Sequence, residues 1–208
     1  MNEGYLSIIL LIIVLILLAS GWRTLLFIDT PPLVLTVFFT LWILGMFVQL
    51  SLSESLKMQG IYLAWVVLVW IAIRYAKWPG ALYFLFTGFF TGLIGYFVQH
   101  IYTLDPVLVV INSRIDLAVL LAFITWTVSR MPLIQAVNVA VALIVVESLQ
   151  LHLKQTEQTM LLGGPGIQDI WWMSYLAVRV CGALSESLSS LIQLFLKHLP
   201  IWMGGSRK

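Results

Sequence analysis

IQDIWWMSYLAVRVCGALSESLSSLIQLFLKH, from Ile167 to His198, is the stretch around which the rest of the chain is predicted to be organised. It is apolar enough to enter a lipid bilayer, yet it contains Asp169, Arg179 and Glu186. An ionisable side chain in hydrocarbon costs roughly 2.5–3.5 kcal/mol on insertion scales, so it usually faces a bundle interior or a water-filled cavity. The remaining segments must therefore supply the surface that these side chains face.

Polar and small residues form one stripe along this predicted helix. They follow one another at alternating steps of three and four, at Arg179, Gly182, Glu186, Ser189 and Gln193. That spacing places them on a single helix face. A continuous helix from Trp171 to His198 would measure about 42 Å, which exceeds a hydrocarbon core of about 30 Å. Its end is therefore expected either to project from the membrane or to bend and lie along the surface.

The composition predicts the fold class. Hydrophobic residues make up 61% of the 208 residues and charged residues only 10%, against about 25% charged in an ordinary soluble domain. The apolar runs are long and continuous rather than alternating, which favours helices over a closed barrel. We therefore predict an all-α, polytopic transmembrane helix bundle that forms one integral membrane domain over residues 1–208.

About seven spans are predicted, three apolar ones followed by four lined with polar residues. The apolar spans cover 5–21, 33–50 and 61–73, and the polar-lined spans cover 81–99, 107–128, 133–151 and 167–198. Pro31-Pro32 and Pro79-Gly80 are expected to break the chain between spans. The span over 107–128 is interrupted in its first half, which could instead re-enter or lie at the interface and leave a shorter span from Ile115.

The distribution of basic residues predicts an orientation with the N-terminus outside and the C-terminus inside. With seven spans, only Lys57 and Lys154 fall in outer loops. The inner segments carry Arg23, Arg74, Lys77, Arg130, Lys197, Arg207 and Lys208. Cytoplasmic loops carry the excess of Lys and Arg in membrane proteins. The expected location is a bacterial cytoplasmic membrane, with the lipid bilayer and another membrane protein as partners.

The polar second half of the chain supplies the candidate site. Its ionisable residues are Arg114, Asp116, Glu147, Asp169, Arg179 and Glu186. Arg179 keeps its charge and needs a partner, and Asp116 and Glu147 are nearest to it in predicted depth. One interpretation is an outward-facing polar pocket floored by Arg179 that takes a small anionic ligand. The other is a structural ion-pair network that holds the helices in register.

Glycines and the single cysteine are interpreted as packing residues. Gly88 and Gly92 form a GxxxG pair, and Gly95 continues the stripe. Small residues at this spacing let two helix backbones approach closely, and packing within the chain is favoured over dimerisation. Cys181 stands alone, so the chain has no internal disulfide.

Several chemistries lack the motifs that they require. The chain has no GxSG, HExxH or GxGD motif and no glycine loop that could cradle a phosphate. His100 and His152 could approach each other, but no HxxxH or ExxH spacing accompanies them. No basic tract suggests nucleic acid. We therefore expect no enzymatic activity, no cofactor, no metal and no nucleic-acid partner.

The order of the elements resembles the YphA-like family of small membrane proteins of Gram-positive, spore-forming bacilli. The resemblance is carried by the acidic N-tail of MNEGYLSIILLIIVLILLASGW, the Asp105-Pro106 turn before the span with Asp116, Glu147 near the end of its span, and WWMSYLAVR in the last span. The resemblance implies a multi-pass membrane protein without an assigned biochemical activity. The expected function is that of a non-enzymatic accessory, interaction or structural membrane component. The alternative is a small-solute or ion permease, or a sensor, that uses the Arg179 pocket.

Overall fold

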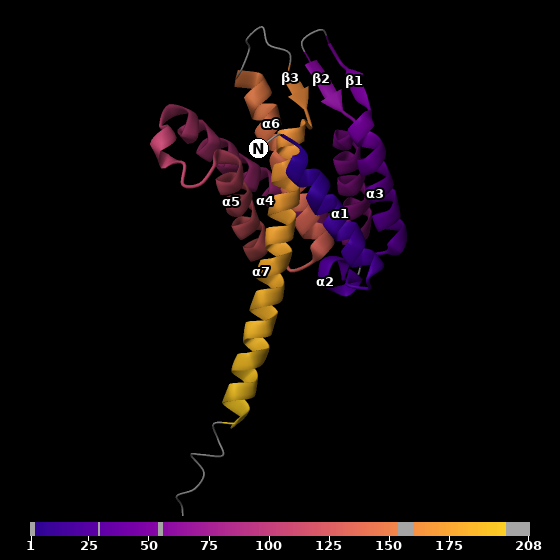
Figure 1. The fold of residues 1–208 in the computed structure, drawn as a ribbon, viewed down its shortest axis with the longest axis vertical. Coiled ribbons are helices and arrows are strands. Elements are labelled where there is room, and N and C mark those ends of the chain that lie inside the picture. The colour runs from indigo at the N-terminus through magenta and orange to yellow at the C-terminus, as the bar shows by residue number, and fades with distance from the viewer. Residues whose placement is uncertain (1–2, 29, 54–55, 154–159, 199–208) are drawn as a thin grey trace, which may run out of the picture.

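A computed structural model describes residues 3–28, 30–53, 56–153 and 160–198 (Figure 1). Helices dominate the described part, and the all-α class is therefore confirmed. The helices are α1 (Tyr5–Ala19), α2 (Arg23–Phe27), α3 (Pro32–Phe47), α4 (Ile61–Leu104), the 3₁₀ turn η1 (Pro106–Leu108), α5 (Ser113–Val128), α6 (Pro132–Leu153) and α7 (Pro165–His198). Three short strands accompany them, β1 (Gln49–Ser51), β2 (Leu56–Gln59) and β3 (Met160–Leu162).

The two ends of the bundle are defined here by the connections that they hold. The upper end holds the start of α1, the three strands and the α4–α5 connection (Figure 1). The lower end holds the connection through α2 and the α5–α6 connection. Arg23 and Arg130 are basic residues of the lower end. Lys154, Arg207 and Lys208, which also entered the predicted orientation, lie outside the described residues.

The helix α4 reverses its direction although its backbone is helical from Ile61 to Leu104. A straight helix of 44 residues would measure about 66 Å. Instead, Ala76 lines a lower-end cavity with Pro132, while Gln99 accepts a hydrogen bond from Gln150 near the upper end of α6. The first part of α4 therefore descends along α6 and the second part returns. The chain thus changes direction in the region of Pro79-Gly80, where a turn was predicted, although the backbone stays helical through the bend.

The other predicted segments differ from the observed helices mainly at their ends. Residues 107–112 precede α5, so the interrupted half of the predicted span 107–128 is not part of its helix. The predicted span 33–50 ends early, because Gln49 already belongs to β1. The short helix α2 and the strands were not predicted. They lie in connections between the predicted spans.

The core is a cluster of aromatic side chains at the meeting point of α3, α4 and α7. The ring centroids of Trp42 and Trp171 are 4.9 Å apart, and Trp172 stands edge-on to Trp171 at the same distance. Trp65 from α4 lies 6.2 Å from Trp42. Offset and edge-to-face pairs of this kind stabilise a core beyond the area that they bury. The aromatic cluster (Trp42, Trp65, Trp171 and Trp172) thus fixes the first half of α7 in the bundle.

Glycines bring the returning part of α4 close to α6. A Cβ atom added to Gly92 would lie 2.6 Å from the carbonyl oxygen of Ala142, and one on Gly88 would lie 2.8 Å from Cβ of Val141. Gly95 faces Leu117 of α5 at a looser 3.2 Å. Any larger side chain at Gly92 would have to push backbone away. These three glycines therefore serve contacts within the chain.

A small sheet joins two upper-end connections that are far apart in sequence. β1 pairs antiparallel with β2, and β2 pairs parallel with β3, with Lys57 opposite Leu161. The β3–α7 turn passes through Gly163, whose φ of +68° suits glycine. The sheet thereby places the start of α7 beside the start of α4.

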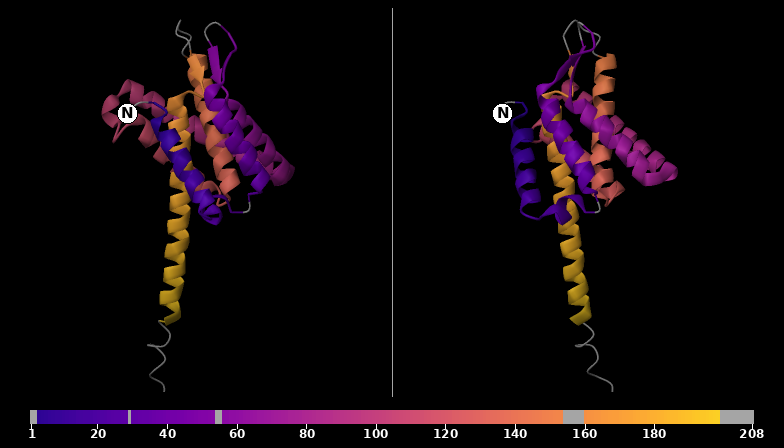
Figure 2. Two further views of the ribbon diagram at one scale, coloured as in Figure 1. Left: turned by 45° about the vertical axis from the view of Figure 1, so that its right-hand side comes forward. Right: turned by 90° about the vertical axis from the view of Figure 1, so that its right-hand side faces the viewer.

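Within the described part of the chain, two stretches are long and apolar enough to cross a membrane, Gly80–Leu104 and Pro132–His152. Three shorter apolar helices cover Tyr5–Ala19, Pro32–Phe47 and Ile61–Ala76. The second half of α7 meets neither description. It leaves the bundle and continues straight, as the two further views make plain (Figure 2). The helix therefore does not bend but extends beyond the bundle.

Candidate functional sites

Asp169 lies in the first turns of α7 and caps α1. One carboxylate oxygen accepts a hydrogen bond from the backbone N–H of Ser7 at 2.7 Å, and the other accepts one from Gly4 at 2.9 Å. The first N–H groups of a helix have no partner within the helix, and a carboxylate there also meets the positive end of the helix dipole. Asp169 therefore ties the start of α1 to α7.

Glu147 performs a similar task for the turn that precedes α7. Both of its carboxylate oxygens accept from the N–H of Gly163, at 3.0 and 3.1 Å. Gln168 donates from its side-chain amide to the carbonyl of Gly163 and to the side-chain oxygen of Gln59. The buried polar groups at this place thus satisfy one another and hold the sheet, α6 and α7 together.

Arg114 and Asp116 lie at the start of α5, away from Arg179. Asp116 accepts hydrogen bonds from the N–H groups of Val110 and Ile111, which closes the turn before the helix. Arg114 forms an ion pair with Glu3 at the surface. Both residues shape the upper end.

Arg179 is buried, with 8% of its surface exposed, and its Nη1 donates to Oε1 of Gln135 at 3.0 Å. The amide of Gln135 in turn donates to the carbonyl of Ser129. Glu147 lies twelve residues further along α6, about 18 Å away at 1.5 Å per residue. The expected pairing of Arg179 with Asp116 or Glu147 is therefore wrong, because both carboxylates bind backbone N–H groups at the upper end.

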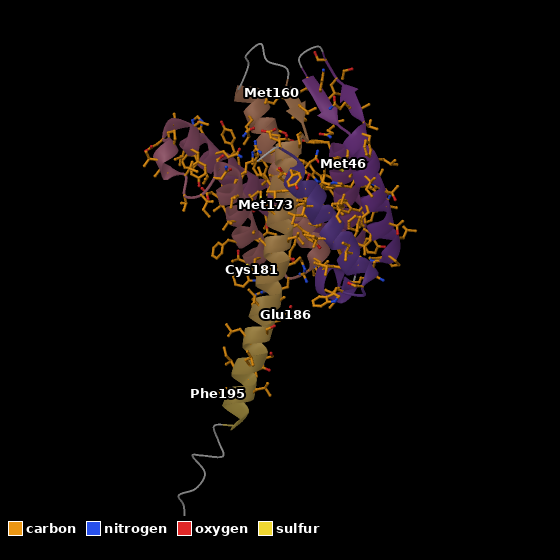
Figure 3. The ribbon with its side chains drawn as sticks, viewed as in Figure 1. Met46, Met160, Met173, Cys181, Glu186 and Phe195 are labelled. Atoms are coloured by element: carbon orange, nitrogen blue, oxygen red, sulfur yellow. The ribbon has the colours of Figure 1, made fainter. Side chains whose placement is uncertain are left out.

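The predicted outward-facing pocket floored by Arg179 is not supported. Among the described residues, Arg179 lines none of the three cavities found. Glu186, expected on the same interior face, is exposed on the part of α7 that lies below the bundle (Figure 3). The helical spacing of the stripe is correct, but the bundle covers only its first members.

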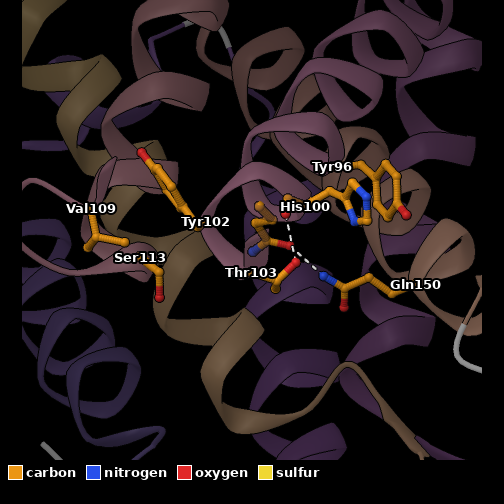
Figure 4. Close-up of a pocket in the computed structure, with 8 residues that line it drawn as sticks. Tyr96, His100, Tyr102, Thr103, Val109, Ser113 and Gln150 are labelled. Carbon is orange, nitrogen blue, oxygen red and sulfur yellow. Dashed lines mark hydrogen bonds between the residues drawn. The ribbon is translucent and has the colours of Figure 1, made fainter. Parts of the chain in front are cut away.

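The largest of the three cavities lies at the upper end and has about 950 Å³ of volume (Figure 4). The rings of Tyr96 and His100 stack with centroids 6.0 Å apart. The Thr103 hydroxyl donates to the backbone carbonyl of His100, and the side-chain amide of Gln150 donates to the side-chain oxygen of Gln99. Its lining is neutral and rich in hydrogen-bonding groups: Tyr96, Gln99, His100, Tyr102, Thr103, Val109, Ser113 and Gln150. Sequence reasoning singled out only His100, because the other residues have no motif spacing.

A second cavity, of about 360 Å³, lies at the lower end between the segment before α3, the bend of α4 and the start of α6. Its walls are mostly apolar, and its polar members are Thr30, Tyr75 and Arg130. The guanidinium of Arg130 stacks on Trp126, 4.8 Å from the ring centroid, and its Nη1 donates to the hydroxyl of Ser185.

No group of three or more His, Cys, Asp or Glu residues within the described ranges could hold a metal ion. Comparison with known proteins found no protein-family model, no curated protein and no solved structure that matches this chain.

Proposed function

We propose that the chain is a multi-pass protein of a bacterial cytoplasmic membrane, with its N-terminus outside, that acts as a non-enzymatic interaction component. The observation that carries the membrane part is an inverted distribution of polarity. Phe86, Phe90 and Phe97 along α4 are well exposed, whereas Asn138 and Ser174 are fully buried. Water would penalise both features, while a bilayer favours them.

The buried polar groups support the same proposal because they are bonded to one another. The hydroxyl of Thr125 donates to Asn138, whose amide donates to the hydroxyl of Thr87. This chain of hydrogen bonds links α5, α6 and α4, and polar side chains link helices in membranes in this way. The YphA-like resemblance belongs to this proposal and adds no activity to it.

Short helices constrain how such a bundle would sit in lipid. α1 has 15 residues and α3 has 16, which gives about 23 Å of rise, less than a typical hydrocarbon core. A bilayer can adapt to such helices by local thinning. We therefore expect the bilayer to be thinner around α1 and α3 than around α6.

The interaction role rests on the exposed second half of α7. Leu184, Leu188, Leu191 and Phe195 follow at steps of four, three and four and are all more than half exposed. This 3.5-residue repeat is the pattern of a two-helix coiled coil. Its flanking positions, Ser185 and Ser187 among them, are uncharged, so a parallel pair of identical helices brings no like charges together. The proposed occupant of this face is the same helix of a second copy.

Cysteine scanning tests orientation and pairing in one background that carries Cys181→Ser. A cysteine at Ser53, near the upper end, should react from outside with a membrane-impermeant thiol reagent, and one at Gln193 only after permeabilisation. The reverse labelling pattern would overturn the orientation. If the protein does not sediment with membranes and both cysteines are labelled without permeabilisation, the proposal of membrane insertion is wrong.

The pairing is tested in the same membranes by oxidation. Leu188→Cys should give a disulfide-linked dimer, because it lies on the repeated face. Gln193→Cys, on the opposite face of the same helix, is the matched control and should remain monomeric. Equal cross-linking at both positions, or none at Leu188, would contradict a helix pair of two copies.

The upper-end cavity supports a second candidate function, that of a sensor for a small neutral solute. Its lining offers amide, hydroxyl and imidazole groups and no carboxylate or guanidinium. If the cavity binds such a solute, at least one compound in a panel of polyols and sugars should raise the melting temperature of the purified protein. The same compound should leave the melting temperature of the Gln150→Leu variant unchanged. A panel without effect would count against the sensor.

A further inference from the structure

We propose that the lower-end cavity is a binding site for one anionic phospholipid, with the phosphate at Arg130 and the glycerol and first part of an acyl chain in the apolar cavity. The inference rests on the proposed membrane location. The polar groups of the site are Thr30, Tyr75 and Arg130, which line one cavity together with the apolar side chains of Ala76 and Leu133.

The shape of the cavity matches an amphiphile better than a free anion. Its volume of about 360 Å³ falls at the small end of the range typical of ligand sites. Most of its lining is carbon, and a fully hydrated anion would gain little from such walls. A lipid can place one charged group at the polar edge and leave the rest of its chains in the surrounding bilayer.

Arg130 is held in position for a phosphate. Its guanidinium stacks on Trp126, and one N–H reaches the hydroxyl of Ser185. A guanidinium has five N–H donors in a planar fork that matches phosphate oxygens. Basic pockets between helices at the cytoplasmic side are suited to anionic headgroups. The lower end also carries Arg23, whose Nη2 donates to the carbonyl of Thr30 at 2.6 Å.

Thr30 supplies an independent observation. The residue is 3% exposed, and within the described part of the chain its buried hydroxyl has no hydrogen-bond partner. A buried polar group without a partner is costly. Thr30 lines the cavity, and a rotation of its side chain would bring the buried hydroxyl within reach of an ester or phosphate oxygen of a bound lipid.

Lipid retention by the full chain in a neutral detergent tests the inference. The probes are dioleoyl phosphatidylglycerol, dioleoyl phosphatidylcholine with the same acyl chains, and inorganic phosphate. Native mass spectrometry should find one retained phosphatidylglycerol, which should also raise the melting temperature. Phosphatidylcholine and phosphate should do neither. An equal response to phosphatidylcholine would overturn the charge requirement, and an equal response to phosphate would replace the lipid by a soluble anion.

The chain offers a matched pair of arginine variants. Arg74 also stacks on a tryptophan, 5.2 Å from the centroid of Trp70, but it does not line the cavity. Arg130→Gln should weaken retention of phosphatidylglycerol about tenfold or more, since hydrogen bonds to a charged group are among the strong ones. Arg74→Gln should leave retention unchanged. Equal losses of retention in both variants would mean that the lipid is attracted by any basic side chain, and this result would contradict a specific site at Arg130.

Thr30→Val keeps the shape of the side chain and removes its hydroxyl. The lipid-free protein should melt at the same temperature or higher, because an unsatisfied group has been removed. Retention of phosphatidylglycerol should fall several-fold. A variant that retains lipid like the parent would overturn the role of Thr30. Failure of membrane insertion would appear in the cysteine labelling described above, so the two proposals fail separately.

Discussion

The two halves of α7 both carry large apolar side chains, but their surroundings are opposite. In the first half, Trp172 and Tyr175 are fully buried among α1, α3 and α4 side chains. In the second half, Leu188 is 60% and Phe195 is 73% exposed, on the part of the helix that extends beyond the bundle (Figures 1 and 3). The same helical periodicity therefore builds a core in one half and an open face in the other. The presence of neighbouring helices therefore decides whether a large apolar side chain of α7 joins the core.

Removal of a large side chain should give the largest difference in the free energy of unfolding between the two halves. Trp172→Ala leaves a cavity in the aromatic cluster and should lower the free energy of unfolding by about 3–5 kcal/mol. Leu191→Ala should change it by less than about 0.5 kcal/mol, because its side chain is already exposed. Denaturant titration in detergent, followed by tryptophan fluorescence, measures both. A large loss for Leu191→Ala in monomeric protein would show that the second half packs against the bundle.

The two carboxylates of α7 provide the next largest contrast. Asp169→Asn weakens the bonds to Gly4 and Ser7 and should cost about 1–2 kcal/mol. Hydrogen exchange should accelerate at the first amides of α1 and remain slow in α6. Glu186→Gln is the control on the same helix and should leave both stability and exchange unchanged. Similar effects from both variants would refute the distinct roles assigned to them.

Arg179 marks the lower limit of the buried half, and its bond to Gln135 can be measured by a double-mutant cycle. Arg179→Met, Gln135→Leu and the double variant should give a coupling free energy of about 1 kcal/mol. The double variant should be more stable than the sum of the single losses predicts, because the bond between the two side chains is lost in each single variant and counted twice in the sum. Additive losses would mean that the 3.0 Å contact contributes no stability.

The smallest expected effect lies at Gly182, on the boundary between the halves. A Cβ atom added there would meet only Nη1 of Arg179, at 3.9 Å, which is ordinary van der Waals contact. Gly182→Ala should therefore stabilise the protein by about 0.5–1 kcal/mol, since alanine favours the helix. Gly92→Ala is the contrasting variant and should destabilise, because the backbone of Ala142 blocks it. Destabilisation by Gly182→Ala would indicate a bend that the straight helix does not contain.

The sequence predicted helix content and the main breaks because these depend on local pattern. The apolar runs and Pro31, for example, give the start of α3 to within a residue or two. The roles of the charged residues depend on distant partners and could not be predicted. Asp169 and Glu147 carry no local sign that they bind the N–H groups of Ser7 and Gly163. The reversal within α4 was foreseen at Pro79-Gly80, although the continuous helical turns were not.

The cavities show the same division between local and distant information. Tyr96 and His100 share a helix, so their proximity follows from their spacing of four. The contribution of Gln150 depends on how α6 packs beside α4. Likewise, Thr30 and Arg130 lie a hundred residues apart and meet only because the lower-end connections converge. No motif search could have joined them.

The cap that Asp169 places on α1 also affects the order in which the protein folds during its synthesis. Ser7 and its acceptor are separated by 162 residues, and ribosomes add about 5–20 residues per second. Once α1 has been made, its first turn must wait on the order of ten seconds or more before that acceptor exists. During this interval water or other polar groups must satisfy those amides. Closure of the bundle is therefore among the last events of its biogenesis, and a ribosome stalled before residue 169 would leave α1 undocked.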